Sequence, residues 1–143
     1  MVQSGCIVSV MKSGITSEIT IGEYIAGFNI CDDLMIMSKN RVNNTWSLVA
    51  STRKSSAKKF TCLQIQDMEV FICTGKQLVY EKKKDRYIHS DQINRGDILC
   101  DVNAQEHVVT RTYTMGSDEI VDVYSLITSD NKPYYINNIL TRT

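Results

Sequence analysis

The sequence contains no long apolar stretch. Its longer apolar segments, such as EVFIC at 69–73 and DLMIM at 33–37, are far shorter than the roughly 18 residues that a membrane-spanning helix needs. The start of the chain also lacks the basic segment followed by an apolar segment that is typical of a signal peptide. We therefore expect a cytoplasmic protein that has no membrane partner.

An excess of charge of one sign is missing as well. Sixteen basic residues balance sixteen acidic ones, so the chain has no long-range field to attract nucleic acid or an anionic membrane. Two basic segments, STRKSSAKKF at 51–60 and YEKKKDRY at 80–87, place lysine and arginine beside an aromatic residue. Both segments are short, and we interpret them as exposed turns or hairpin loops. No nucleic-acid partner is expected.

Motifs for metal binding and for general catalysis are also absent. The sequence has no CxxC pair, no HExxH motif, no GxSxG elbow and no Walker loop. Its two histidines, His89 and His107, could each act as a base for a cysteine nucleophile in space, but the sequence does not select a pair. We expect no metal and no organic cofactor. The cysteines are interpreted as reduced and mostly buried: Cys6, Cys31, Cys62, Cys73 and Cys100.

What the sequence does contain is a series of short segments rich in β-branched and aromatic residues, separated by Gly, Asn, Asp or Ser. About eleven such segments predict a single all-β, antiparallel domain over residues 1–143. Short helices are predicted only at IGEYIAG (21–27), ended by Gly27, and at about 87–94. The predicted strands are 6–10, 17–21, 33–37, 46–51, 58–65, 69–74, 77–80, 97–102, 107–115, 120–128 and 134–140.

Three local features are predicted within these segments. Tyr134 and Tyr135 alternate along a strand, so we expect one to pack inward and the other to cover the surface. Asn137 and Asn138 are predicted to form a turn, because Asn readily adopts a left-handed conformation. Gly96 is predicted to make the tight turn before the strand at 97–102.

The segment VYSLITSDNKPYYINNILTRT at 123–143 resembles the C-terminal splicing motif of inteins, which belong to the Hint (hedgehog/intein) family. That motif reads V-Y-D-L-x-V, then a few residues, then H-N-Y-F-A-N-G-I-L-V-H-N. The alignment needs no gap. Identical or similar residues fall at Val123, Tyr124, Tyr134, Tyr135, Asn137, Ile139 and Leu140.

Two further segments resemble intein motifs in the same order along the chain. MEVFICTGKQLVY at 68–80, followed by INRGDIL at 93–99, is similar to the middle motif, and residues 1–25 are similar to the opening motif. The resemblance therefore spans nearly the whole chain. It implies a pseudo-twofold Hint fold of horseshoe-like antiparallel β-sheets with one or two short helices. No long block separates the middle and final motifs, which implies a mini-intein without an endonuclease.

The resemblance also implies an autocatalytic, single-turnover reaction, protein splicing. In inteins, a thiol or hydroxyl of the first residue attacks the preceding carbonyl, and a Thr-x-x-His pair polarises that peptide and protonates its nitrogen. A terminal asparagine then cyclises with help from a histidine before it. The implied partners are the flanking exteins in cis or a complementary split fragment, and the implied state is a monomer. The first and last residues are expected to lie side by side.

In the first half of this reaction, this chain departs from the family pattern at two positions. Met1 stands at the place of the first nucleophile, and its thioether has no proton to lose. Thr74 keeps the threonine of the middle motif, but Gln77 replaces its histidine and cannot transfer a proton near neutral pH.

The C-terminal motif is altered at four more positions. Ser125 replaces an aspartate, Lys132 replaces a histidine, Arg142 replaces the penultimate histidine, and Thr143 replaces the cyclising asparagine. The chain as written is therefore expected not to splice. The candidate catalytic positions expected to form one centre are Met1, Thr74, Gln77, Lys132, Arg142 and Thr143.

Three interpretations of these substitutions remain open. The chain is an engineered form with altered splice junctions, or a natural Hint-like domain that has become a non-catalytic interaction or structural module. Alternatively, Cys6 is the first intein residue and the nucleophile, with MVQSG as the preceding extein. Spacing favours Met1 as the first residue, because this places Cys6 at the sixth position of the family pattern and Val8 at the next strand residue.

Overall fold

The structure is a computed structural model, and it describes residues 1–27, 34–40 and 43–143. The described residues form one helix, α1 (Ile21–Gly27), one 3-10 helix, η1 (Ser90–Gln92), and twelve strands. The strands are β1 (Val2–Gln3), β2 (Ile7–Lys12), β3 (Ile15–Thr20), β4 (Met35–Asn40), β5 (Asn43–Ile65), β6 (Phe71–Cys73), β7 (Leu78–Glu81), β8 (Arg86–His89), β9 (Ile98–Cys100), β10 (Glu106–Thr128), β11 (Tyr134–Ile136) and β12 (Ile139–Arg142).

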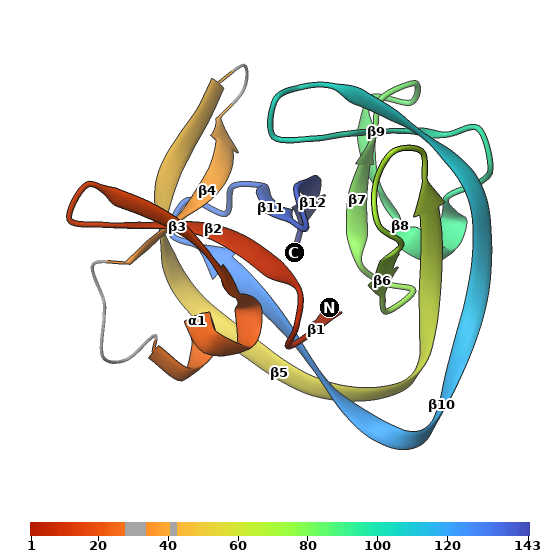
Figure 1. The fold of residues 1–143 in the computed structure, drawn as a ribbon, viewed down its shortest axis with the longest axis horizontal. Helices are drawn as coiled ribbons and strands as arrows, with labels where there is room; N and C mark the ends of the chain where they lie inside the picture. Colours follow the sequence, from red (N-terminus) through yellow and green to blue (C-terminus); the bar gives the residue numbers. More distant parts are fainter. Residues whose placement is uncertain (28–33, 41–42) are drawn as a thin grey trace.

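Two long strands, β5 and β10, form the backbone of the fold. Each has 23 residues, and they pair antiparallel from Ile65 opposite Val109 to Val49 opposite Thr128. Figure 1 shows this curved ribbon joining two arms, one made of α1 and β2–β4 and the other of β6–β9. The register shifts between Gly116 and Val121, and such an irregularity bends and twists a strand.

The prediction for residues 51–60 was wrong, because this polar segment is part of β5 and not a turn or loop. Most of its side chains are exposed, which explains its composition, but its backbone pairs with β10. The other basic segment, 80–87, forms the predicted hairpin: Glu81 of β7 pairs with Arg86 of β8.

The helix prediction for residues 21–27 is confirmed. Thr20 precedes this helix, and its hydroxyl accepts the Glu23 N–H at 3.1 Å and donates to the Glu23 carboxylate at 3.0 Å. This reciprocal arrangement stabilises a helix N-terminus. The second predicted helix, at 87–94, is reduced to the single 3-10 turn of η1, preceded by β8.

The segment 134–140, predicted as one strand, is a hairpin made of β11 and β12. Asn137 and Asn138 have φ angles of 49° and 69°, which confirms the predicted turn. Tyr134 and Tyr135 are both buried, so the expectation that one covers the surface was wrong. The reason is that β11 lies inside the fold, where the Tyr135 hydroxyl donates to Asn44 Oδ1 at 2.7 Å.

The buried core draws on both arms and on the chain ends, and includes Val2, Leu126 and Ile139. The predicted turn at Gly96 is confirmed by its φ of 92°. No helix in the described part of the chain is both long and apolar enough to cross a bilayer. Cys62, Cys73 and Cys100 are buried and Cys6 is half-buried, whereas Cys31 lies outside the described residues.

Candidate active site at the two chain ends

The Met1 backbone is held by Thr74 from two directions. The Met1 nitrogen donates a hydrogen bond to Thr74 Oγ1 at 2.9 Å, and the Thr74 N–H donates to the Met1 carbonyl oxygen at 2.9 Å. Thr74 follows β6 directly, so the strand end sets the position of its hydroxyl. Burial lowers the pKa of the Met1 ammonium, despite nearby thiols that act in the opposite direction. The structure thus brings together two of the predicted site residues.

The turn that carries Thr74 is supported by the 3-10 helix η1. The Ser90 hydroxyl donates to the Thr74 carbonyl oxygen at 2.9 Å, and the Ser90 N–H donates to the Gln77 carbonyl oxygen at 2.8 Å. A Cβ atom on Gly75 would lie 2.9 Å from Asp91 Oδ2, so a larger residue at position 75 would require the Asp91 side chain to shift. Sequence analysis missed Ser90, and no motif signalled it.

Gln77 connects this turn to the end of β12. Its side chain is 3% exposed, and Nε2 donates to the Arg142 carbonyl oxygen at 3.0 Å and to the Leu78 carbonyl oxygen at 3.1 Å. The Arg142 guanidinium itself lies over the Tyr87 ring, 5.8 Å from the centroid, and donates to the Asn131 carbonyl oxygen at 3.2 Å. The backbone of Arg142 therefore belongs to the site, whereas its charged group is directed elsewhere.

Thr143 is held by β10 and β11. The Thr143 hydroxyl donates to the Leu126 carbonyl oxygen at 2.5 Å and lies 2.8 Å from the Tyr134 hydroxyl. The Tyr134 hydroxyl also accepts the Leu126 N–H at 3.1 Å. Sequence analysis assigned Tyr134 to packing and did not single out Leu126. Burial raises the pKa of Tyr134, so this phenol remains protonated near neutral pH.

Lys132 makes its observed bonds within one loop. The Lys132 N–H donates to Thr128 Oγ1 at 2.5 Å, and the Thr128 hydroxyl donates to the Lys132 carbonyl oxygen at 3.1 Å. The Lys132 ammonium lies 3.5 Å from the Asp130 carboxylate. These bonds do not connect Lys132 to the network formed by Met1, Thr74 and Gln77.

Cys6, the alternative nucleophile, packs near the Asn137 turn. Burial raises the pKa of its thiol, although a hydrogen bond with the Asn137 side chain opposes this. The Cys6 carbonyl oxygen accepts the Ile21 N–H at 2.7 Å, at the start of α1. Met1, and not Cys6, makes the hydrogen bonds to Thr74.

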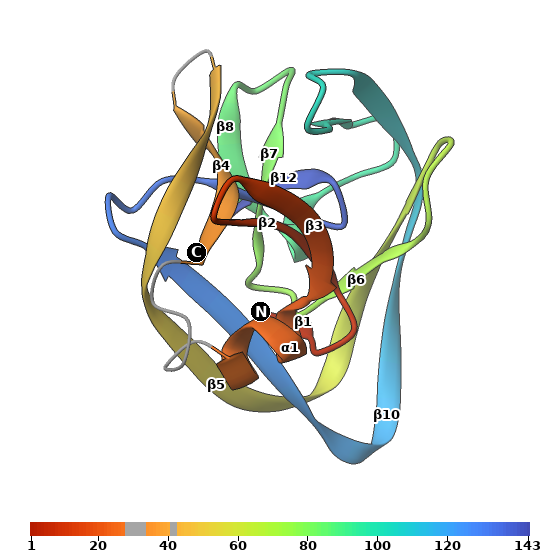
Figure 2. The ribbon, with the colours of Figure 1, turned by 60° about the vertical axis from the view of Figure 1, so that its left-hand side comes forward.

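The two chain ends lie together between the arms of the fold. In Figure 1 and Figure 2 both ends are near the middle of the molecule. The hydrogen bonds explain this arrangement: Met1 is joined to Thr74, Thr74 to Gln77 through a backbone bond of 3.0 Å, and Gln77 to Arg142. One short turn thus contacts both ends of the chain.

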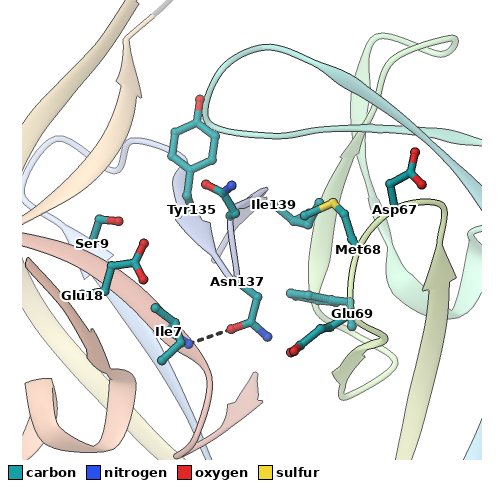
Figure 3. A pocket seen from close by; sticks show the side chains of 11 residues that line it. Ile7, Ser9, Glu18, Asp67, Met68, Glu69, Tyr135, Asn137 and Ile139 are labelled. Atoms are coloured by element: carbon teal, nitrogen blue, oxygen red, sulfur yellow. Dashed lines mark hydrogen bonds between the residues drawn. The ribbon is translucent and has the colours of Figure 1, made fainter.

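A separate cavity of about 310 Å³ lies beside β2 and the β11–β12 turn. Figure 3 shows Ile7 and Asn137 at its wall, where the Ile7 N–H donates to Asn137 Oδ1 at 2.7 Å, and Glu18, Asp67 and Glu69 around it. None of the candidate catalytic positions lines this cavity.

No protein-family model matches the sequence, and no curated protein matches it. Solved structures do match, over the full length of the chain. An intein from a hyperthermophile superposes with a TM-score of 0.84 at 17% identity, covering 99% of this chain and 98% of its own. The chain has the fold of a mini-intein. A transcription factor IIB mini-intein (Mvu) gives a TM-score of 0.83 at 13% identity, with 100% of both chains covered.

The intein fold confirms the predicted all-β Hint architecture. A bacterial intein-like domain from Clostridium thermocellum also matches, with a TM-score of 0.76 at 19% identity, covering 100% of this chain and 99% of its own. Because the mini-intein and this chain cover each other completely, the intein fold here contains no inserted endonuclease domain.

Proposed function

We propose that this chain is a protein-splicing element, one Hint unit over residues 1–143, that acts as a cytoplasmic monomer on polypeptides flanking it in cis. The observation that carries the proposal is the hydrogen-bond network from Met1 through Thr74 and Gln77 to Arg142, which sets both ends of the chain at one site.

The first step would take place at the Met1 nitrogen. In a precursor this nitrogen belongs to the peptide bond that joins Met1 to the residue before it, and Thr74 Oγ1 lies 2.9 Å away. A hydroxyl in that position polarises the bond and stabilises charge that develops as the nitrogen leaves. The Met1 thioether cannot attack the preceding carbonyl, so the usual first nucleophile is missing.

The last step would take place at Thr143. Its hydroxyl is held by Leu126 and Tyr134, but threonine has no side-chain amide with which to cyclise. Gln77 donates a neutral N–H to the Arg142 carbonyl oxygen, and this polarises the carbonyl without transferring a proton. We therefore propose that the chain as written does not complete splicing.

Restoring the missing groups tests this proposal. We expect the restored chain, expressed between two affinity tags of which the second begins with cysteine, to produce a ligated tag-to-tag product on a gel. The network already holds both ends, and that cysteine thiol accepts the acyl group of the first tag. Unsubstituted chain serves as the control and should yield no ligated product. The restored chain carries Met1→Cys, Gln77→His, Arg142→His and Thr143→Asn.

A second substitution in the restored chain separates the role of the site from the general reactivity of a cysteine. Thr74→Ala removes the hydroxyl beside the Met1 nitrogen, and we expect it to slow cleavage at the first junction by about 100-fold. Persistent precursor with no cleavage at either junction of the restored chain would instead favour a non-catalytic Hint-like interaction domain.

A further inference from the structure

The cavity beside the β11–β12 turn combines an apolar lining with negative charge. Its apolar lining residues are Ile7, Met68, Phe71 and Ile139. Three acidic residues with exposed positions surround it: Glu18, Asp67 and Glu69 (Figure 3). Among the described residues, no lysine, arginine or histidine lines this cavity. The lining itself therefore leaves the negative charge uncompensated.

The three carboxylates come from both arms of the fold. Glu18 of β3 lies opposite Ser9 of β2, and directly opposed residues of an antiparallel pair project from the same face. Asp67 and Glu69 belong to the loop between β5 and β6, where Asp67 turns the chain with a φ of 62°. Within the described ranges, no three acidic, cysteine or histidine side chains are grouped closely enough to hold a metal ion.

An apolar lining below separated carboxylates suits a long cationic side chain. Lysine and arginine pack their methylene stems on apolar surface and keep the charged group at the edge, in contact with water. The cavity volume of about 310 Å³ lies at the small end of the range for ligand pockets. Its size and charge therefore favour one or two side chains over a large ligand.

The start of the chain lies beside this cavity. Burial lowers the pKa of the Met1 ammonium, and the Cys6 thiol is close enough to oppose that shift. Cys6 in turn forms a hydrogen bond with the side chain of Asn137, which lines the cavity. Phe71, another lining residue, begins β6, and Thr74, which holds the Met1 nitrogen, directly follows that strand. Residues that position Met1 thus adjoin the cavity wall.

We propose that this cavity receives a lysine or arginine side chain of the segment that precedes Met1 in a precursor. Four extended residues span about 13 Å, which gives such a side chain its reach. Exposed ion pairs are individually weak. A tethered side chain, however, has an effective concentration on the order of millimolar, so weak pairs suffice to hold it. This inference rests on the proposed function and assigns a basic character to the preceding polypeptide.

The test uses the unsubstituted chain with a four-residue extension of glycine and serine before Met1. A single lysine replaces each extension residue in turn, and a carbodiimide joins its amine to a nearby carboxylate with loss of water. We expect peptide mass spectrometry to find that lysine joined to Glu18, Asp67 or Glu69 of the same chain. Extensions with glutamine in place of lysine provide the background, and they should lack these cross-links.

A matched pair of double variants separates the cavity from the total charge. Asp67→Asn with Glu69→Gln removes two cavity carboxylates, and asparagine tolerates the positive φ of residue 67. We expect the remaining cross-link to Glu18 to fall by about threefold, the order of effect of two exposed ion pairs. Asp118→Asn with Glu119→Gln removes the same charge from an exposed part of β10 outside the cavity. This control should leave the cross-link to Glu18 unchanged.

Three outcomes would overturn the proposal. The extension lysine could react with Asp118 and Glu119 as often as with the cavity carboxylates, or the two double variants could give equal yields. Cross-links that join two chains would instead assign the cavity to a second copy of the protein.

The cross-linking requires no reaction at either junction, so it is independent of splicing. Ligation by the restored chain without cross-links in the cavity would overturn this inference and leave the proposed function standing. Cavity cross-links together with a restored chain that does not ligate would overturn the proposed function alone.

Discussion

Gln77 is a single buried residue that connects the Thr74 turn to the end of β12. Its amide donates to the Arg142 carbonyl oxygen, and its backbone carbonyl accepts the Ser90 N–H. A neutral amide can hold and polarise a carbonyl, but it cannot exchange a proton near pH 7. Gln77 therefore holds the Arg142 carbonyl without being able to supply a proton there.

A different residue pair, His107 and Asp101, makes stability depend on pH. His107 Nε2 lies 2.8 Å from Asp101 Oδ2, and these side chains are 15% and 6% exposed. The hydrogen bond to Asp101 raises the pKa of His107. Burial acts to raise the pKa of Asp101, but hydrogen bonds from His107 and from the N–H groups of Gln105 and Asn103 outweigh it and lower this pKa.

The directions of these shifts define where the pair stabilises the fold. The raised pKa of His107 stabilises the folded protein at pH values below the His107 pKa in the unfolded chain, which is near 6.5. This stability is lost as the pH rises through the His107 pKa of the folded protein. The lowered pKa of Asp101 stabilises the folded protein at pH values above the Asp101 pKa in the unfolded chain, which is near 3.9. This stability is lost as the pH falls through the Asp101 pKa of the folded protein. The contribution is therefore greatest around pH 5.

We predict that His107→Gln lowers the free energy of unfolding by up to about 1 kcal/mol at pH 5 and by less at pH 8. Urea unfolding at the two pH values measures the difference. Asp101 also accepts two backbone N–H groups, so Asp101→Asn is unsuitable as a matched control. An equal loss at pH 5 and pH 8 would mean that His107 acts through packing and not through its charge.

The β11–β12 hairpin joins the two ends of the chain to the core. Asn137 turns the chain, donates its N–H to the Ile7 carbonyl oxygen at 2.9 Å, and accepts the Ile7 N–H on its side chain at 2.7 Å. Both turn residues have positive φ, as two-residue hairpin turns of this type require. One short element thus sets the direction of β12 and also anchors the start of β2.

We predict that Asn137→Ala lowers the free energy of unfolding by about 2–3 kcal/mol, because alanine disfavours positive φ and leaves the Ile7 N–H without its partner. The matched control is Asn138→Gly, since the exposed Asn138 also has positive φ and glycine tolerates it. The control should change stability by less than about 0.5 kcal/mol. Similar losses in both variants would show that neither the positive φ of residue 137 nor its contact with Ile7 explains the cost.

At the level of the whole molecule, the β5–β10 ribbon holds the two arms in one structure. Its pairing runs from Ile65 opposite Val109 to Val49 opposite Thr128, so the arms do not depend on the chain connection between β9 and β10. That connection is an exposed turn at residues 102–105, where Ala104 has a φ of 60°.

We predict that cleavage at a protease site introduced between Asn103 and Ala104 leaves the two pieces associated, because the long pairing between β5 and β10 remains intact. Size-exclusion chromatography of the cleaved protein should give a single peak that contains both pieces on a denaturing gel. Separate elution of the pieces would show that the covalent connection, and not the strand pairing, holds them together.

The local elements and their class could be predicted from the sequence. Short segments rich in β-branched and aromatic residues predicted strands, Gly27 was predicted to end the α-helix at 21–27, and the two asparagines marked the hairpin turn. The Hint fold was implied by the resemblance of three segments, in order along the chain, to intein motifs. These features depend on neighbouring residues and backbone preferences, which a linear pattern records directly.

Contacts between residues far apart in the chain could not be predicted in this way, because they arise only in the folded protein. Residues 51–60 read as a loop because their side chains are polar, yet pairing with β10 makes them a strand. The hydrogen bond from Ser90 to Thr74 and the contact of Thr143 with Tyr134 depend on segments that are separate in the chain. Strand register and burial are properties of the assembled sheet, so no local pattern contains them.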